Sequence, residues 1–184
     1  MKLVAGPQPG AIPVTVTSLE MTDPAGLVDA PTPPGAALWI ANEPRPDLSA
    51  SFYERVGAPW HWVDRLTWTP AQWLAWVDRP EHHLLVCTLD GVEAGYAELE
   101  QQADGNVEIA YFGLLAQAQG RGLGKWLLAR AIDQAWRLPG TTRVWVHTCD
   151  LDGPAALPNY LGRGLREFAR EVEWRMPDAP TSGN

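Results

Sequence analysis

The sequence predicts a single α/β domain, spanning residues 1–184, with a mixed and mostly antiparallel sheet flanked by helices. Three observations support this fold class. A length of 184 residues with 46% hydrophobic residues suits one domain with a sizeable core. Extended patterns dominate residues 83–115. A glycine-rich loop at 119–125 then leads into a helical pattern that reaches about residue 137, and another strand pattern follows at 142–149. Strands therefore alternate with helices in the second half.

The first part of the chain carries two strand candidates and one helix. Alternating Val and Thr predict a strand over 13–21. Four prolines between residues 24 and 34 predict a surface loop. Residues 37–40 form a short apolar segment that suits a strand, and helical periodicity predicts a helix over 48–56.

A second helix begins after Thr69. The Thr69 side chain can accept a hydrogen bond from a first-turn N–H, Pro70 suits the first helical position, and Gln72 completes a capping box. Trp73 and Trp76 have helical spacing, so they are expected to pack inward.

Three antiparallel strands are predicted next, over 83–89, 92–100 and 106–115. Asp90-Gly91 is a strong two-residue hairpin signal, and Asp104-Gly105 lies in the second turn. An apolar helical face follows over 123–137, and Val and Trp dominate the strand predicted at 142–149. A strand–helix–strand unit this short predicts parallel strands.

The end of the chain is predicted as a short helix and a last strand. Pro158 cannot lie deep inside a regular helix, so the helix is expected to have a distorted first turn or to begin near Leu157. Gly164 is placed to end it. A strand over 168–176 and a flexible tail over 177–184 complete the prediction, with residues 13–176 folded.

Composition limits the partners and the compartment. The formal net charge of −8 argues against binding to nucleic acid or to an anionic membrane, and no segment has transmembrane length. Cys87 and Cys149 lie in apolar runs, which favours buried free thiols and a reducing compartment, so a cytoplasmic location is expected. The four histidines lack metal-ligand spacing, and no metal is expected. The oligomeric state stays open, a homodimer included.

The segment Gln119–Lys125 is a glycine-rich loop that opens a helix, a combination suited to phosphate. It is not a P-loop, because Gln119 stands where the first glycine is needed and Trp126 follows the lysine. It is not a dinucleotide fingerprint, because Lys125 replaces the third glycine. The pattern that remains, Gln119-x-x-Gly122-x-Gly124, resembles the acyl-coenzyme A pyrophosphate loop of the GNAT family of N-acetyltransferases.

The resemblance to the GNAT family extends over residues 83–176. The order of strands and helices matches, and Ala156, Tyr160 and Gly164 are similar to the family's Ala-x-x-x-Tyr-x-x-x-Gly-Phe pattern. Two departures occur: Gly153 stands where many members have Asn, and Leu165 replaces the Phe. The resemblance implies acetyl-coenzyme A as co-substrate and acetyl transfer to an amine by direct attack.

The resemblance also implies roles for particular residues. Backbone N–H groups of the loop would bind the pyrophosphate, and main chain near the end of the preceding strand would accompany the pantetheine arm. The implied coenzyme-binding residues are Phe112, Leu114, Gln119, Gly120, Arg121, Gly122, Gly124, Lys125 and Ala156. Arg121 and Lys125 would add positive charge, although solvated cations at a helix start remain an alternative.

Two residues are the candidate proton donors and acceptors. The resemblance implies that Tyr160 is the general acid, because the family has a tyrosine with this role at the same motif position. A phenol stays protonated at neutral pH and can donate to the departing sulfur. Glu108 is the candidate base, acting directly or through water, with Glu98 and Glu100 as backups. Simple packing of Tyr160 and a solvent-facing Glu108 are the alternatives.

The amine acceptor is expected to contact Trp60, His61 and Trp62, since the family usually binds it between the first two helices. Aromatic walls can hold a cation or an apolar group, and His61 could deprotonate the amine; burial in the core is the alternative for the tryptophans. Two rival functions stay open: an acyl-coenzyme A binding module without turnover, and a scaffold whose loop binds no nucleotide. The acceptor itself is not identified by the sequence.

Overall fold

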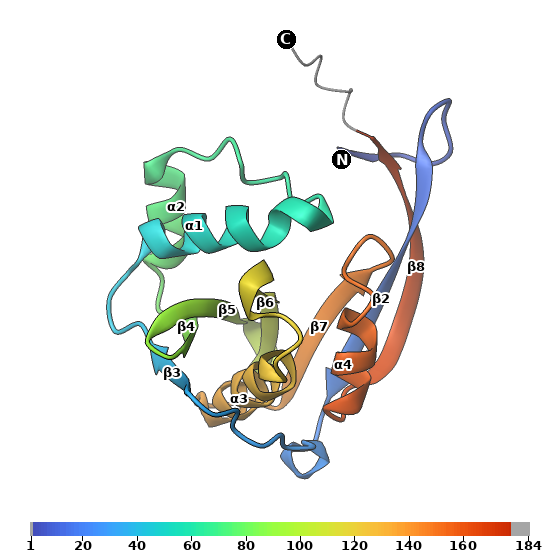
Figure 1. Cartoon of the computed structure of the whole chain (residues 1–184). Coiled ribbons are helices and arrows are strands. Elements are labelled where there is room, and N and C mark those ends of the chain that lie inside the picture. The colour runs from blue at the N-terminus through green and yellow to red at the C-terminus, as the bar shows by residue number, and fades with distance from the viewer. Residues whose placement is uncertain (1, 178–184) are drawn as a thin grey trace.

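The structure is a computed structural model that describes residues 2–177, in which one sheet lies between two layers of helices (Figure 1). The strands are β1 (Lys2–Val4), β2 (Ile12–Met21), β3 (Ala36–Ile40), β4 (His82–Leu89), β5 (Val92–Gln101), β6 (Asn106–Leu114), β7 (Arg143–Cys149) and β8 (Arg166–Met176). The helices are α1 (Pro46–Gly57), α2 (Pro70–Val77), α3 (Leu123–Arg137) and α4 (Ala156–Gly162). The tail predicted at 177–184 lies, apart from Pro177, outside the described residues.

The eight strands form one sheet in the order β1-β8-β2-β7-β6-β5-β4-β3. Every neighbouring pair is antiparallel except β6 and β7, which are parallel. The predicted mixed, mostly antiparallel α/β fold is therefore confirmed, as is the parallel pairing across α3. The short β1 adds a strand before the predicted first strand, because Lys2–Val4 pairs with the end of β8.

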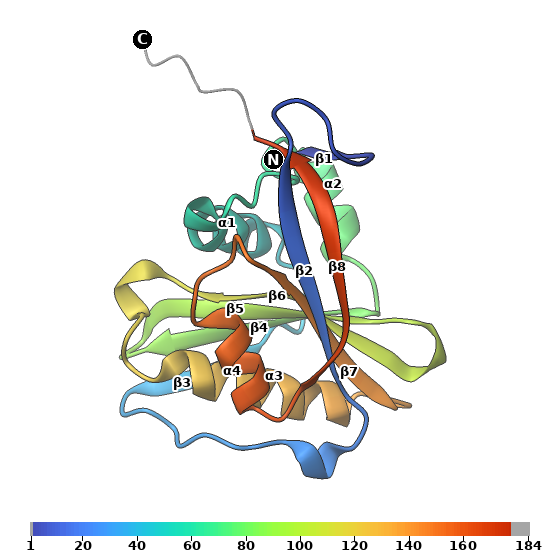
Figure 2. The same cartoon turned by 90° about the vertical axis from the view of Figure 1, so that its right-hand side faces the viewer.

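Helices cover both faces of the sheet (Figure 2). On one face, α1 packs over β4, β5 and the end of β6 through a cluster that includes Phe52, Val56 and Tyr96. On the other face, the apolar side of α3 is buried, with Leu127 and Ile132 fully enclosed. The helical periodicity of the sequence thus predicted which side of α3 faces the core.

Capping residues and prolines in the sequence also predicted where the helices begin. Thr69 and Gln72 form the predicted capping box at the start of α2. Helix α1 begins at Pro46, two residues before the prediction, because proline fits the first helical turn. Helix α4 begins at Ala156, so Pro158 lies in the first turn, where its missing N–H costs no helical hydrogen bond.

Other predictions have mixed outcomes. Both cysteines are free: Cys87 is buried, which raises the pKa of its thiol to about 11, whereas Cys149 is only partly buried. Strand β8 begins at Arg166, two residues before the predicted start of the last strand. Phe168 lies at a register shift between β2 and β8, and Phe168 and Val172 are largely exposed. No helix within residues 2–177 is long and apolar enough to cross a membrane.

Candidate functional site

A cleft of ≈ 340 Å³ lies between the α1–α2 connection and the point where β6 and β7 separate. The two strands pair only from Asn106 to Glu108 on β6 and from Arg143 to Trp145 on β7. Beyond Glu108 they diverge, as Figure 1 shows, so the β6 edge facing β7 has no strand partner there. Unpaired main-chain groups at the mouth of a cleft can bind an extended ligand.

The cleft brings together residues that are far apart in the sequence. Its lining includes both catalytic candidates and all three acceptor-side candidates, together with Phe112. The residues that line it are Tyr53, Trp60, His61, Trp62, Asp64, Arg65, Trp76, Glu100, Glu108, Ile109, Ala110, Tyr111, Phe112, Val146, His147, Thr148, Cys149, Asp152, Tyr160 and Arg175.

Glu108 forms a pair with His147 across the two parallel strands. The Oε1 atom of Glu108 lies 3.2 Å from Nδ1 of His147, and its Oε2 atom accepts a hydrogen bond of 2.7 Å from Gln102. The Glu108 side chain is 12% exposed, so it is not the solvent-facing carboxylate that was the alternative. The hydrogen bond to Glu108 raises the pKa of His147 above its usual 6.5, although burial opposes this shift.

Tyr160 lies on α4 with its side chain facing the cleft and the core. The residue is 6% exposed, and its ring centroid lies 6.1 Å from that of Phe112. Its hydroxyl has no hydrogen-bond partner within residues 2–177. Burial raises the pKa of Tyr160, and the nearby charge of Asp152 adds to this effect, so the phenol stays protonated at neutral pH.

The glycine-rich loop lies beside the end of β6 and next to α4. Gly120 and Gly122 have φ angles of +75° and +79°, and a Cβ added at either would meet no atom within 4 Å. Gly122 is the N-cap of α3 and provides no side-chain hydrogen bond, so the first-turn N–H groups have no side-chain cap. Gly124 lies close to the Leu114 side chain, and its carbonyl accepts a hydrogen bond of 3.1 Å from Asn159.

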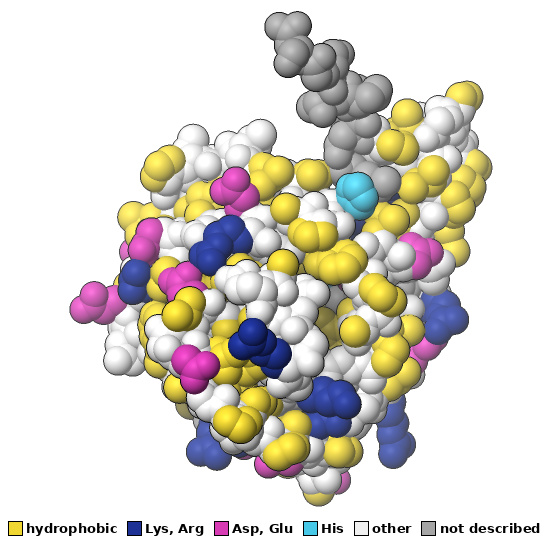
Figure 3. Space-filling view, viewed as in Figure 1, with side chains coloured by type: hydrophobic (Ala, Val, Ile, Leu, Met, Phe, Trp, Pro, Cys, Tyr) yellow, Lys and Arg dark blue, Asp and Glu magenta, His cyan; other side chains and the backbone are white. Residues whose placement is uncertain are grey.

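The charged residues of this loop are exposed. Arg121 and Lys125 both face solvent, as does Gln119. In the view of Figure 3, basic side chains lie over the middle of the face that contains the start of α3, and acidic and basic side chains are interspersed around it. A helix N-terminus with unpaired N–H groups and neighbouring cations favours a bound phosphate. Ala156 is half-buried at the start of α4, behind this region.

Trp60, His61 and Trp62 form the wall of the cleft opposite β7. Trp62 packs against Tyr111, with ring centroids 5.3 Å apart, and is therefore partly a packing residue. His61 is exposed and has a left-handed backbone, with φ 59°. The Trp60 indole lies over Gly153: a Cβ added there would be 3.1 Å from two indole carbons. The glycine that departs from the family pattern thus makes room for Trp60.

The two backup carboxylates are engaged elsewhere. Glu98 is buried outside the cleft lining, and it accepts hydrogen bonds from Ser49 (2.6 Å) and Trp76 (2.8 Å). Burial by itself would raise its pKa, but these bonds and His82 lower it. Glu100 lines the cleft, but it is paired with Arg79 at 2.7 Å.

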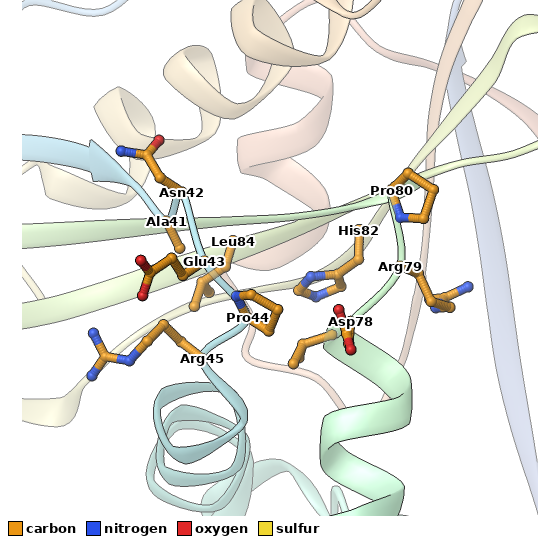
Figure 4. Close-up of a pocket in the computed structure, with 11 residues that line it drawn as sticks. Ala41, Asn42, Glu43, Pro44, Arg45, Asp78, Arg79, Pro80, His82 and Leu84 are labelled. Carbon is orange, nitrogen blue, oxygen red and sulfur yellow. The ribbon is translucent and has the colours of Figure 1, made fainter.

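A second cavity, of ≈ 270 Å³, opens between the β3–α1 connection and the α2–β4 connection (Figure 4). The ring of His82 and the side chain of Leu84 lie at its inner end, and Glu43, Arg45 and Asp78 surround its mouth. None of the residues predicted from the sequence as site residues lines it. The cleft at β6 and β7 is therefore the candidate site.

Two residues of the cleft, His147 and Arg65, were not predicted from the sequence. Trp145 is paired with Glu108 in the parallel register, so His147, two residues later, falls on the same side of the sheet. That register could have been proposed from the sequence. No sequence signal indicated that Arg65 would enter the cleft, since it lies in an irregular segment whose course depends on packing.

The fold combines a layered α/β sheet, two parallel strands that separate, and a glycine-rich turn at the start of a helix beside the opening. Unpaired main-chain groups and a helix N-terminus at an opening are features suited to an extended ligand that carries phosphate. The comparisons identify the family. A family model described as the acetyltransferase (GNAT) family matches residues 43–165, and the chain belongs to this family. Comparison with curated protein sequences gives no match.

Solved structures show the same fold at low sequence identity. A GCN5-related N-acetyltransferase from Kribbella flavida has a TM-score of 0.64 and 22% identity over 94% of this chain and 62% of its own. A GCN5-related N-acetyltransferase from Sphaerobacter thermophilus has a TM-score of 0.70 and 18% identity, over 90% of this chain and 52% of its own. An aminoglycoside acetyltransferase from an uncultured soil metagenomic sample, solved in complex with sisomicin, has a TM-score of 0.57 and 14% identity. The match covers 70% of this chain and 88% of that structure. The chain thus spans 52–62% of the first two structures.

Proposed function

We propose that this protein transfers an acetyl group from acetyl-coenzyme A to an amine by direct attack. Family membership supports the use of acetyl-coenzyme A. The observation that carries the proposal is that Glu108 and Tyr160 line the same cleft, at the open edge of β6. Acetyl-coenzyme A supplies an activated thioester, and the chain supplies its binding surface and the proton transfers.

The coenzyme would lie along two surfaces. The uncapped N-terminus of α3, with Gly120 and Gly122, is suited to the pyrophosphate, and the charges of Arg121 and Lys125 would add to the attraction. The β6 edge from Ile109 to Leu114, which lacks a β7 partner, offers main-chain groups to the amide-bearing pantetheine arm. These contacts would direct the thioester toward Tyr160.

Glu108 then accepts the proton that the amine must lose, directly or through one water, so that the nitrogen lone pair can attack the carbonyl carbon. The carbon–nitrogen bond forms, the carbon–sulfur bond breaks, and Tyr160 donates its proton to the departing sulfur. The second proton that the nitrogen loses as the amide forms restores the Tyr160 hydroxyl. His147 holds the Glu108 carboxylate in place and carries a partial positive charge near neutral pH. The products are an amide and the free thiol of coenzyme A, and one proton is released to solvent.

Binding and turnover can be tested separately. Acetyl-coenzyme A is expected to raise the melting temperature, because a ligand that binds only the folded state stabilises it by mass action. An amine panel monitored for free thiol then distinguishes an enzyme from a binding module. Absence of a thermal shift at millimolar coenzyme would contradict the whole proposal. A shift without thiol release from any amine would favour the binding module.

A charge change in the loop tests where the coenzyme binds. Gly122→Asp places a carboxylate at the start of α3, against the proposed pyrophosphate, and is expected to weaken coenzyme binding at least about tenfold. Gly140→Asp is the matched control, since Gly140 has nearly the same φ (78°), equally open surroundings and a place at the far end of α3. Equal affinity of the two variants in a calorimetric titration would refute the loop assignment.

A further inference from the structure

Arg65 extends into the cleft inside a cage of aromatic rings. Its guanidinium carbon lies 3.8 Å from the ring centroid of Trp76, 4.3 Å from that of Trp68 and 4.7 Å from that of Tyr111. Its backbone N–H donates to the Tyr53 hydroxyl at 3.2 Å, which fixes the start of the side chain. The aromatic surface near the acceptor side is thus already occupied by a cation, and a second cation would be repelled there.

Arg65 carries a positive charge that is not balanced within the described part of the chain. No carboxylate there lies within ion-pair distance of it, including that of its neighbour Asp64. Among the other charged groups of the cleft, Glu100 pairs with Arg79, Arg175 pairs with Glu173 and Glu108 pairs with His147, whereas Asp64 has no ion-pair partner within the described residues. The Nη1 atom of Arg65 is buried and has no hydrogen-bond acceptor.

An unpaired buried donor is unfavourable, and a charged one more so. Aromatic rings stack on the flat surface of a guanidinium and cannot accept its in-plane hydrogen bonds. The group that matches this edge is a planar oxyanion, because a carboxylate accepts two parallel N–H bonds from one guanidinium. The aromatic cage preorganises Arg65 for such a ligand by restricting its rotamers.

We propose that the acceptor is an amine that also carries a carboxylate, an amino acid or a close analogue, and that Arg65 binds the carboxylate. This inference rests on the proposed function and specifies its substrate class. Arg65 is a binding residue in this scheme, since it would touch the substrate at a distance from the reacting atoms.

Arg65 and the proposed base lie in the same cleft. Tyr111, which contacts Arg65, lies three residues after Glu108 on β6, and the register of β5 and β6 shifts between these two residues. Arg65, Glu108 and Tyr111 all line the cleft, so one small substrate can face both the guanidinium and the base.

The experiment compares acceptors that differ in the carboxylate. Thiol release is measured with the twenty protein amino acids, their α-amides and the corresponding decarboxylated amines, using wild type, Arg65→Met, Arg65→Lys and Arg55→Met. Arg55 is the matched control: it also lies near an aromatic ring and carries the same charge, but it pairs with Glu93 outside the cleft. Melting temperature and acetyl-coenzyme A affinity establish that each variant is folded.

We expect kcat/KM of the wild type to be at least about tenfold higher for the best amino acid than for its amide or decarboxylated amine. Arg65→Met should abolish this preference by lowering the rate with the amino acid alone, and Arg65→Lys should retain part of it. Arg55→Met should keep it fully. If Arg65→Met fails to fold, the inference is still tested by two measurements: the preference of the wild type for amino acids over carboxylate-free amines, and the part of that preference that Arg65→Lys retains.

Two results would overturn the inference. Equal kcat/KM for amino acids and their carboxylate-free counterparts, or an unchanged preference in the Arg65 variants, would refute the role of Arg65 while leaving the acetyltransferase proposal intact. Absence of thiol release from every compound, amines included, would refute both proposals.

Discussion

Tyr160→Phe removes one hydroxyl and keeps the aromatic ring, so it tests the proposed general acid with little change in packing. The ring is buried against Phe112, and the hydroxyl makes no hydrogen bond to the described part of the protein. No partner is therefore left unsatisfied by the substitution. We expect the free energy of unfolding to change by less than about 1 kcal/mol.

The expected effect on turnover is larger. General acids typically contribute about 10²–10⁴-fold to a rate. A thiol has a pKa of about 8.5, and its thiolate can leave near neutral pH, so we expect an effect at the lower end of this range. The value of kcat should fall about 10²-fold, which corresponds to a rise of about 2.7 kcal/mol in the activation free energy. Burial raises the pKa of Tyr160, so the phenol stays protonated from about pH 6 to 9. The loss should therefore be independent of pH in this range.

The assay is thiol release at saturating coenzyme, together with a titration of coenzyme affinity, which should be nearly unchanged. Tyr96→Phe is the matched control, because Tyr96 is fully buried and has an unpaired hydroxyl but does not line the cleft. That variant should keep full turnover and be as stable as the wild type or slightly more stable. An unchanged kcat in Tyr160→Phe, or an equal loss in Tyr96→Phe, would refute the assignment of Tyr160 as the acid.

Two further predictions concern the cleft walls. Glu108→Gln should slow turnover and lower the pKa of His147 toward 6.5, as measured by NMR titration; an unchanged pKa would contradict the pairing. Because folding raises this pKa, the stabilisation from the pair is present below pH 6.5 and is lost as pH rises through the folded pKa, and Glu108→Gln should remove that dependence. Gly153→Asn should lower the melting temperature because the new side chain displaces Trp60, whereas in a Trp60→Ala background it should be tolerated. Additive effects in this double-mutant cycle would show that the two residues do not interact.

Much of the fold could be predicted from the sequence because its signals are local. The capping box at Thr69 and the hairpin at Asp90-Gly91 depend on residues within a few positions of one another, and both occur in the structure. The short helix near Leu157 was placed within one residue because proline excludes a deeper position. The family was also identified from the glycine-rich loop and the Tyr160 motif, and the family model agrees.

The sequence by itself therefore determined the order of strands and helices, the buried side of α3 and the family. Tertiary structure decided which side chains share the cleft. Glu108 and His147 meet because two parallel strands separate just after their third paired residue, and Arg65 enters the cleft because three aromatic rings from different segments surround it. Such contacts depend on packing between distant segments, which no local pattern of residues encodes.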